Sequence, residues 1–591
     1  MKNSIRKGFL IDGVFFRMFC VLLLGTMSTM LANVIDAVVT GQFLGGSAVA
    51  AMGLASPMIL FTNVASGLLV SGTNQLCTRY MGKADVFRVN QVFSTMAVCS
   101  VGICLLAGIL VFGFSPTYLS IVAKGVDEQT IAMAVDYLRG FSFMIPAVGL
   151  AVLLSGLMPL DNDQMRGMGF AMIMLVLDVV LDLFNVLVVH GGLLGMALAS
   201  VISCYAGLIW LFMHFKKPGH LLRFLPRDLC FSDLGEVLSY GFVGAMMMLL
   251  NSVRGVIFNA VLLWEGGTPA VAAHSAASGA FILVIALITT IQSTTASISG
   301  LSYGEQDEEG IRRTLSNALS LSYRVYLVLG VFLFAGADIF AKLFLNDPSA
   351  SDSIALAAVF IRCLTIQNVF TIAGNAVTGI YMGTGRVKLN YLIGVLRDGL
   401  FPCAGVLLLG HMFGIPGVEA SFIVAGLLTF MTIFAIPVFI NRKLPTGLHD
   451  LLLLPKAFAP DPSECLEASI ADLEEAVNVS ERAYSFCLER GEDRKTANFI
   501  SLFVEEMGGN AVRHGIEGVR NGIVEVKLIL NEEKKMIRIK DNGRPFDPVS
   551  WLEKNDSEDP TANIGIRMVV SLAKEVRYVP AMSINNLLIY I

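Results

Sequence analysis

The sequence predicts a polytopic α-helical membrane protein with twelve spans in two six-helix lobes, followed by a C-terminal α/β two-layer sandwich. Three observations predict this fold class. The chain is 55% hydrophobic and only 15% charged, whereas about 25% of residues are charged in soluble proteins. An internal repeat runs through the part before residue 442, and dense charge begins near residue 464. The net charge of −5 argues against nucleic acid as a partner.

The spans follow from the apolar runs. A helix that crosses a bilayer needs roughly 20 mainly apolar residues. Twelve runs meet this requirement, centred near residues 27, 64, 103, 145, 179, 203, 251, 289, 333, 368, 399 and 428. Their connections are short, apart from the loop at 214–236. We therefore expect one lobe at 1–213 and the other at 237–442, in contact with lipid on their outer surfaces.

The two lobes carry the same landmarks. The segments MGKAD (81–85) and YGEQD (303–307) follow the second and eighth spans and share a glycine and an aspartate at an offset of 222 residues. The glycine pair of GGLLGMALAS (191–200) recurs in FGIPGVEAS (413–421) at the same offset. A constant offset between distant landmarks indicates two structural repeats, with a binding site expected at their interface.

Loop charges predict the orientation. Lysine and arginine gather in the N-terminal segment and the even-numbered loops, whereas the odd-numbered loops hold Lys124 and little else. Because cytoplasmic loops are the positively charged ones, we expect both termini and the C-terminal domain to be cytoplasmic.

Polar side chains recur at helical spacing inside the first lobe. The first span places Asn33 and Asp36 on one stripe, and the fifth places Asp178, Asp182 and Asn185 on one face. Ionisable groups at membrane depth are costly and usually functional, although hydrogen bonds between packed helices are the alternative. Such a carboxylate can exchange a proton for Na⁺ or an organic cation, which is the chemistry of an antiporter.

The second lobe shows amides without matching acids. Asn368 and Asn375 share a face of the tenth span, and Arg254 lies in the seventh. The three carboxylates of the first lobe therefore predict a binding lobe for cations. Arg254 would pair with a carboxylate or contact an anionic group of a substrate.

Residues 10–442 resemble the MATE family of multidrug and toxin extrusion transporters. The resemblance rests on NVIDAVVTGQFLGGSAVAAMGLASPM, MGKAD, LDLFNVLVVHGGLLGMALASVIS, SYGEQD and GIYMGTGRVKLN, at the family's intervals. It implies alternating access and export of small organic, often cationic, compounds driven by H⁺ or Na⁺. Asp36 and Asp182 match acids of the family pattern. Asp178 stands where that pattern commonly has asparagine, so the coupling ion is not carried over.

The C-terminal part changes character after a proline-marked linker at 443–465. From 466 to 591 the patterns predict the order helix, helix, strand, strand, lid, helix, strand, strand. The segment from Glu464 to Glu492 has a helical pattern, as does 496–516. The strand patterns at 521–530 and 535–543 alternate as in half-buried strands.

Three boxes of this domain resemble the GHKL ATPases, and most closely the anti-sigma-factor serine kinases. They are the stripe of Glu506 and Asn510, the DNGRPFDP segment that contains Asp541 and Gly543, and the NIGIRMVV segment that contains Gly565. The resemblance implies binding of ATP with Mg²⁺. Asn510 would supply an oxygen ligand to Mg²⁺, and Glu506 would orient or deprotonate a nucleophile as the catalytic residue.

The other boxes would hold the nucleotide. Asp541 would accept from the adenine amino group, Gly543 would allow close approach of the base, and Gly565 would present backbone N–H groups to phosphate. Residues 549–563 would form the lid. Asn563 replaces the first glycine of the family's lid helix, which leaves tight ATP binding and serine/threonine kinase activity open.

Three functions of different classes fit these residues. The first is a secondary transporter with a regulatory nucleotide domain, since no GxxxxGK[ST] loop of an ABC-type pump is present. The second is a membrane sensor kinase that phosphorylates or sequesters a sigma-factor or anti-anti-sigma-like partner. The third is a lipid-linked oligosaccharide flippase, which would line its cavity with cations. Both resemblances together are typical of bacteria, so we expect a multi-pass protein of the bacterial cytoplasmic membrane.

Overall fold

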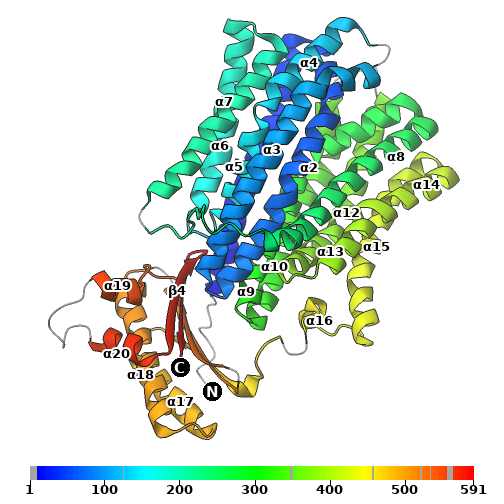
Figure 1. Ribbon diagram of the computed structural model, residues 1–591. Helices are drawn as coiled ribbons and strands as arrows, with labels where there is room; N and C mark the ends of the chain where they lie inside the picture. The colour runs from blue at the N-terminus through cyan, green and yellow to red at the C-terminus, as the bar shows by residue number, and fades with distance from the viewer. Residues whose placement is uncertain are drawn as a thin grey trace.

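The computed structural model describes most of the chain. The described residues are 10–123, 126–217, 219–345, 351–455, 458–519, 522–532, 534–554 and 564–591. Lys124, Asn563 and the lid beyond residue 554 therefore lie outside them. Two helical lobes stand side by side, and a smaller domain with a sheet lies at one end of the spans (Figure 1).

The first lobe contains seven helices, two of which form one bent span. They are α1 (Leu10–Val39), α2 (Gly46–Gly82), α3 (Val86–Val122), α4 (Glu128–Ser142), α5 (Ile145–Leu157), α6 (Gln164–Phe184) and α7 (Gly192–Phe212). The axes of α4 and α5 differ by 48°. In the second lobe the helices are α8 (Leu234–Ala280), α9 (Ile282–Gly304), α10 (Glu308–Ala335), α11 (Ala337–Phe344), α12 (Ser351–Gly383), α13 (Val387–Gly394), α14 (Phe401–Phe413) and α15 (Ile415–Asn441).

The described residues contain 11 helices long and apolar enough to span a membrane, or 12 spans when the bent pair counts as one. This confirms the predicted fold class. The repeat is also present in the backbone. Ala84 and Gln306, 222 residues apart, have φ of 55° and 57°. Asp85 and Asp307 each cap the following helix, accepting from the backbone N of Arg88 at 3.1 Å and of Gly310 at 3.0 Å.

The two repeat loops meet at the end of the spans that faces the small domain. A Cβ on Gly82 would lie 2.2 Å from the carbonyl oxygen of Leu301, and a Cβ on Gly304 would lie 2.2 Å from that of Arg79. Only glycine permits the ends of α2 and α9 to approach this closely. The lobes are therefore closed against each other at this end.

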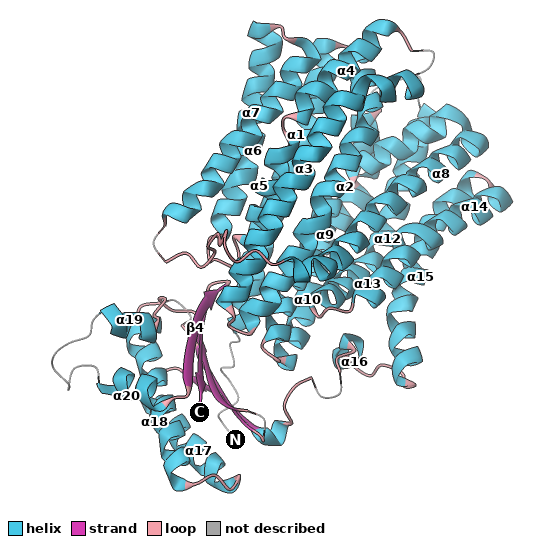
Figure 2. Ribbon diagram, in the orientation of Figure 1, coloured by secondary structure: helices cyan, strands magenta, loops and turns pink. Residues whose placement is uncertain are grey.

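The C-terminal domain is a five-stranded antiparallel sheet with helices on one face (Figure 2). Its strand order is β1-β2-β3-β5-β4. The strands are β1 (Cys465–Ile470), β2 (Val524–Leu530), β3 (Lys535–Asp541), β4 (Glu575–Ala581) and β5 (Ile584–Tyr590), and the helices are α17 (Leu473–Glu489), α18 (Arg494–Asn510), α19 (Pro548–Lys554) and α20 (Ile564–Leu572). The predicted two-layer sandwich is confirmed.

The helical prediction for the start of this domain was wrong in part. Cys465–Ile470 forms β1, which pairs antiparallel with β2, and the helix begins only at Leu473. The predicted linker also contains a short helix, α16 (Leu448–Leu452). The hydroxyl of Tyr381 in α12 donates to the carbonyl oxygen of Leu451 at 2.9 Å, so this segment packs against the second lobe.

The second face of the sheet packs against the two lobes. Ile537 and Ile539 of β3 point to the helices, whereas Arg538 and Lys540 point the other way and are also buried. β3 is thus buried on both faces, rather than half-buried as predicted, and β5 is buried on both faces as well.

Charged and polar contacts hold this docked face. Lys540 forms an ion pair with Glu305, and its Nζ lies 3.5 Å from Oδ2 of Asp307, both in the second lobe. Asn586 Nδ2 donates to Glu305 Oε1 at 3.1 Å. The loop at Asn162 contacts the same domain from the first lobe, where Nδ2 donates to the carbonyl oxygen of Pro580 at 3.0 Å. The sheet therefore bridges both lobes where they meet.

Candidate functional site

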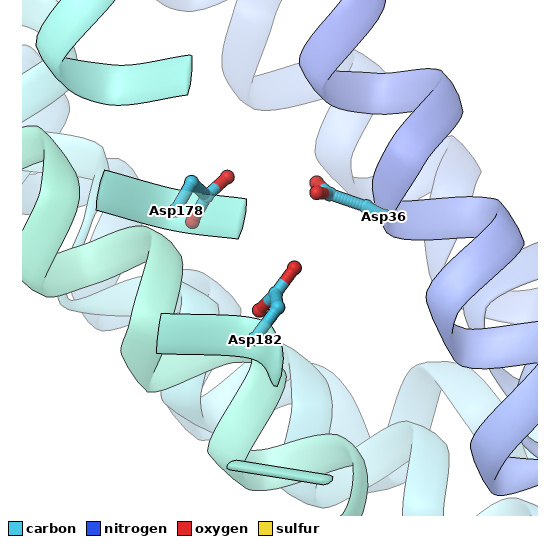
Figure 3. Close-up of side chains that lie close together, drawn as sticks. All are labelled: Asp36, Asp178 and Asp182. Atoms are coloured by element: carbon cyan, nitrogen blue, oxygen red, sulfur yellow. The ribbon is translucent and has the colours of Figure 1, made fainter. Parts of the chain in front are cut away.

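Three aspartates from two helices form a cluster in the first lobe. Asp36 projects from α1, and Asp178 and Asp182 project from α6 toward it (Figure 3). One carboxylate oxygen from each lies within 4.8 Å of the other two. Asp178 is 4% exposed and Asp182 is 1% exposed. The sequence spacing had placed these acids on separate stripes, and the packing of α1 on α6 joins them.

Three of the six carboxylate oxygens in this aspartate cluster are buried without a protein hydrogen bond. Among the described residues, both oxygens of Asp182 and Oδ1 of Asp36 are buried without a partner. Asp178 Oδ1 accepts from the Ser203 hydroxyl at 3.4 Å. Buried carboxylates are normally paired or bound to a cation. The cluster can therefore hold a proton or a metal cation between its oxygens.

One further residue belongs to the surroundings of the cluster. Tyr137 of α4 interacts electrostatically with all three carboxylates. Its sequence context, an amphipathic helix, gives no signal for this role. A tyrosine hydroxyl beside carboxylates can donate to one of them when it is charged.

Two predicted residues do not join the cluster. Asn185 begins the π-helical turn after α6, where its Nδ2 donates to the carbonyl oxygen of Gly192 at 2.9 Å and its Oδ1 accepts from the backbone N of Gly191 at 3.1 Å. A Cβ on Gly195 would lie 1.9 Å from that Oδ1. Asn185 thus stabilises the turn between two spans through these hydrogen bonds. Asn33 is exposed on α1.

A cavity of about 1130 Å³ lies between the two lobes. Helices of both lobes line it, and its lining includes Arg254, Asn368 and Asn375 but none of the three clustered aspartates. The predicted interface therefore holds a cavity, and the second-lobe residues line it. The aspartate cluster is separate from this cavity.

The cavity also contains an ion pair that the sequence analysis did not predict. Arg397 and Asp398 are neighbours in the eleventh span, with Nη2 and Oδ2 2.7 Å apart. Arg397 Nη1 also donates to Asn375 Oδ1 at 2.6 Å. Both residues line the cavity together with Arg254. Adjacent opposite charges inside an apolar run, LIGVLRDGLFP, are the signal that could have found them.

The C-terminal domain brings its predicted adenine-binding residues together. Asp541, at the end of β3, accepts at Oδ1 from the backbone N of Gly543 at 2.8 Å and from Asn585 Nδ2 at 2.7 Å. Burial raises the pKa of Asp541, and these two hydrogen bonds oppose the rise. Both bonds fall on Oδ1, so Oδ2 is placed to accept from an amino group. Asn585 on β5 is a positioning residue that the motifs did not predict.

Gly543 and Gly565, the glycines of the second and third boxes, lie where two segments of the chain approach each other closely. A Cβ on Gly543 would lie 2.3 Å from the backbone of Gly515, which follows α18. A Cβ on Gly565 would lie 2.0 Å from Oε2 of Glu506. The start of α20 therefore lies directly over Glu506. Asn510, one turn further along α18, is half-buried. These residues fit an adenine nucleotide with Mg²⁺.

Comparison with known families agrees with both halves of the chain. The MatE family model matches residues 22–184 and 245–400, and the model described as histidine kinase-like ATPase domain matches residues 470–587. A protein described as "Probable multidrug resistance protein NorM" from Listeria monocytogenes serovar 1/2a is 27% identical over 126 residues. That match covers 21% of this chain and 27% of the relative.

Solved structures share the fold of the two lobes. A crystal structure of MATE in complex with MaL6 superposes with a TM-score of 0.68 at 20% identity, over 71% of this chain and 94% of that chain. A MOP superfamily transporter from Pyrococcus furiosus, described as having a binding pocket of reverse polarity, gives 0.67 at 20% identity, over 73% and 97%. The chain thus belongs to the MatE family of transporters and carries a histidine kinase-like ATPase domain at its C-terminal end.

Proposed function

We propose that this protein is a secondary active transporter that exports organic compounds in exchange for H⁺ or Na⁺, under the control of a nucleotide-binding domain. In this proposal it is a multi-pass protein of the bacterial cytoplasmic membrane, with the ATPase-like domain in the cytoplasm. The observation that carries the proposal is the cluster of Asp36, Asp178 and Asp182. Buried carboxylate oxygens without hydrogen-bond donors favour a bound cation.

The aspartate cluster and the cavity would bind different ligands. A proton or Na⁺ would bind at the cluster, and the organic compound would bind in the 1130 Å³ cavity between the lobes. Ion binding would change the packing of α1 on α6, and α1 also lines the cavity through Thr26 and Thr29. This shared helix supports coupling between the two sites.

The charge of the cargo has two candidates. The three carboxylates favour a cationic compound that reaches the cluster. The cavity lining favours a compound with an anionic or acceptor group, because Arg254 lies there beside the ion pair of Arg397 and Asp398. Among the described residues Arg254 makes no salt bridge with the clustered aspartates. It interacts electrostatically with Asp398, which is already bonded to Arg397. One unpaired arginine is fewer cations than a lipid-linked oligosaccharide would need.

The ATPase-like domain would bind Mg-ATP and act on the transporter through the docked sheet. Asp541 and Asn585 support recognition of adenine, while Glu506 and Asn510 support the phosphate and Mg²⁺ end. A serine kinase activity toward a sigma-factor-like partner is the second candidate for this domain. Glu506 beneath Gly565 favours it, because a carboxylate there can deprotonate a nucleophile.

The test is gradient-driven transport in proteoliposomes. The protein would be reconstituted with an imposed pH or Na⁺ gradient, and uptake of a quaternary ammonium dye and of a carboxylate dye would be compared. We expect Asp36→Asn and Asp182→Asn each to lower gradient-driven transport at least about tenfold, as expected for loss of an ion-binding charge.

A matched control removes an exposed acid of the same lobe. Asp136→Asn on α4 makes the same chemical change outside the cluster and should transport at the wild-type rate. Undiminished transport in both cluster variants would disprove the role of the cluster. Preference for the carboxylate dye would select the Arg254 cavity as the determinant of cargo charge.

A further inference from the structure

A second cavity lies at the junction between the transporter and the ATPase-like domain. Its volume is about 560 Å³. Arg79 and Lys83, at the end of α2, line it from the first lobe, and Lys534, Arg538 and Arg577 line it from the sheet. We call this space the junction cavity. No described residue in its lining is an aspartate or glutamate.

Only two of these five cations have a carboxylate partner. Arg79 Nη1 lies 2.9 Å from Glu236 Oε1, and Arg577 Nε lies 2.6 Å from Glu575 Oε1. For Lys83, Lys534 and Arg538 the described residues provide no salt bridge. Three cations without a salt bridge among the described residues therefore line one cavity.

Arg538 is the most deeply buried of them. Its side chain is 4% exposed, and Nη1 donates to the carbonyl oxygen of Glu305 at 2.7 Å. Its Nε is buried without a hydrogen-bond partner among the described residues. The carboxylate of Glu305 is already bonded to Lys540 and Asn586. Asp307 interacts electrostatically with Arg538, but the described residues provide no salt bridge between them. A buried guanidinium without a salt bridge is costly, so the unpartnered Nε favours an anionic ligand.

Lys534, which also lines the junction cavity, lies in an environment that favours an anionic ligand too. Burial lowers the pKa of Lys534, and repulsion from Arg538 and Arg577 lowers it further. Its Nζ lies 5.9 Å from the centroid of the Tyr590 ring, and Arg577 lies 5.4 Å from the same ring. Lys534 and Arg577 thus lie over the same aromatic ring, that of Tyr590.

We propose that the junction cavity binds a small phosphate-bearing anion, which joins the ATPase-like domain to the transporter. Phosphate oxygens accept two parallel hydrogen bonds from arginine and one from each lysine, the chemistry that these side chains offer. Each negative charge of such a ligand would offset one of the three cations that lack a salt bridge. The phosphate has two chemical sources, a soluble polyphosphate or nucleotide and the headgroup of an anionic phospholipid.

This site is separate from the predicted ATP site. Arg538 and Asp541 lie on opposite faces of β3, because residues along a strand alternate between faces. Asp541 faces the helices, and Arg538 faces the lobes. The anion would therefore neutralise repulsion across the docked surface and strengthen the contact between the two domains.

The test uses the full chain in a neutral detergent, at low ionic strength so that screening is small. Binding of sodium pyrophosphate would be followed by calorimetry. We expect saturable binding to the wild type, and affinity at least about tenfold lower in the Lys83→Gln/Lys534→Gln double variant. Neither lysine is fully buried, so this variant avoids disrupting the core.

Two controls keep the sites apart. Lys574→Gln removes an exposed lysine outside the cavity and should leave pyrophosphate affinity unchanged. Addition of EDTA should also leave it unchanged, because the predicted ATP site would hold phosphate through Mg²⁺, whereas the junction cavity would hold it through arginine and lysine. Short-chain phosphatidylglycerol and phosphatidylcholine would be titrated in parallel.

Each result decides the proposal. Pyrophosphate binding that the double variant loses supports a soluble ligand. Binding of phosphatidylglycerol but of neither pyrophosphate nor phosphatidylcholine, with the same loss, supports a lipid headgroup. Equal binding by the wild type and the double variant, or binding of neither phosphate compound, would overturn the proposal.

Discussion

Asp178 distinguishes the aspartate cluster from a simple pair of acids. It adds a third carboxylate beside Asp36 and Asp182, yet it is the one that the Ser203 hydroxyl contacts. In a site of low polarity, each added carboxylate changes the number of cations needed for neutrality. The residue that departs from the family pattern is therefore expected to affect how much charge is exchanged, more than whether exchange occurs.

We predict that Asp178→Asn preserves gradient-driven transport but lowers the charge moved per cargo molecule by about one. Asparagine keeps an acceptor for Ser203 while removing the charge. The measurement is the reversal potential of transport in proteoliposomes, at several imposed membrane potentials. A reversal potential identical to that of the wild type would show that Asp178 takes no part in ion coupling.

A second prediction for single residues distinguishes the phosphate and Mg²⁺ end of the nucleotide site from its adenine end. Asn510→Ala should weaken binding of Mg-ATP to the full chain by roughly tenfold to a hundredfold, the range for a hydrogen bond or ligand to a charged group. It should have little effect on ATP in the presence of EDTA. Asp541→Asn should weaken ATP binding in both conditions, since it contacts the base.

Calorimetry of the two variants checks this pattern, with Asn531→Ala as a control, because that asparagine lies in the turn between β2 and β3. Equal effects of Asn510→Ala with and without Mg²⁺ would show that Asn510 is not a metal ligand.

At the scale of single elements, β3 is the strand that connects the two functions. One face carries Ile537 and Ile539 into the domain core, and the other carries Arg538 and Lys540 onto the repeat loop of α9. Its last residue, Asp541, reaches the nucleotide site. A shift of this strand on nucleotide binding would therefore reach the closed end of the two lobes directly.

We predict that Lys540→Met weakens docking of the sheet on the lobes by about 3–5 kcal/mol, the cost of removing one partner of a buried ion pair. Hydrogen exchange of the peptide around residues 303–307 measures it. Lys535→Met is the matched control on the same strand. Its partner, Glu492, lies within the ATPase-like domain, so docking should not change.

The pH dependence of docking follows from the same pair. Burial lowers the pKa of Lys540, but the attraction of Glu305 and Asp307 outweighs it and the pKa is raised. Its contribution is present below the ordinary lysine pKa and is lost as pH rises through the raised value. For Asp307, burial raises the pKa, but Lys540, Lys527 and Arg538 together with the hydrogen bond from the Gly310 backbone N–H outweigh this, and the pKa is lowered. That contribution is present above the ordinary carboxyl pKa and is lost as pH falls through the lowered value.

Docking should therefore be constant across neutral pH and should weaken only at the acid and alkaline extremes. In Lys540→Met the loss of docking at acid pH and the loss at alkaline pH should both become smaller. A transition near pH 6 to 7 in the wild type would contradict this assignment and would indicate a histidine.

The sequence predicted those features that local patterns determine. Hydropathy defined the spans, and helical spacing found Asp36, Asp178 and Asp182. It could not show that α1 and α6 pack together, because that depends on contacts between distant segments. Asn185 had the right spacing for the cluster, but its amide is used by the turn at Gly191 and Gly192.

The features that the sequence did not predict depend on contacts with segments far away in the chain, which a local sequence pattern does not contain. Residues 465–470 (CLEASI) include good helix formers, and pairing with β2 makes them a strand. Arg538 and Lys540 alternate with apolar residues as on a solvent face, yet the lobes cover them. The boxes found Asp541 and Gly565, whereas Asn585 follows from the sheet topology that places β5 beside β3.

At the scale of the whole molecule, two lobes with the MATE fold are closed at one end, and a sheet contacts both lobes there. Because the sheet touches Asn162 of the first lobe and Glu305 of the second, separation of the lobes at this end must break or stretch those contacts. The ATPase-like domain is thus placed to favour the conformation closed on its own side. Nucleotide binding would change the rate of transport without supplying its energy.

The most direct test of this account is the dependence of transport on nucleotide in proteoliposomes with an imposed ion gradient. The protein would be oriented with the ATPase-like domain accessible, and cargo transport would be measured without nucleotide, with Mg-ATP, and with Mg-ATP but no gradient. We predict transport driven by the gradient alone, a rate that changes with Mg-ATP, and no accumulation without the gradient. Accumulation that requires Mg-ATP and persists without an ion gradient would contradict the account.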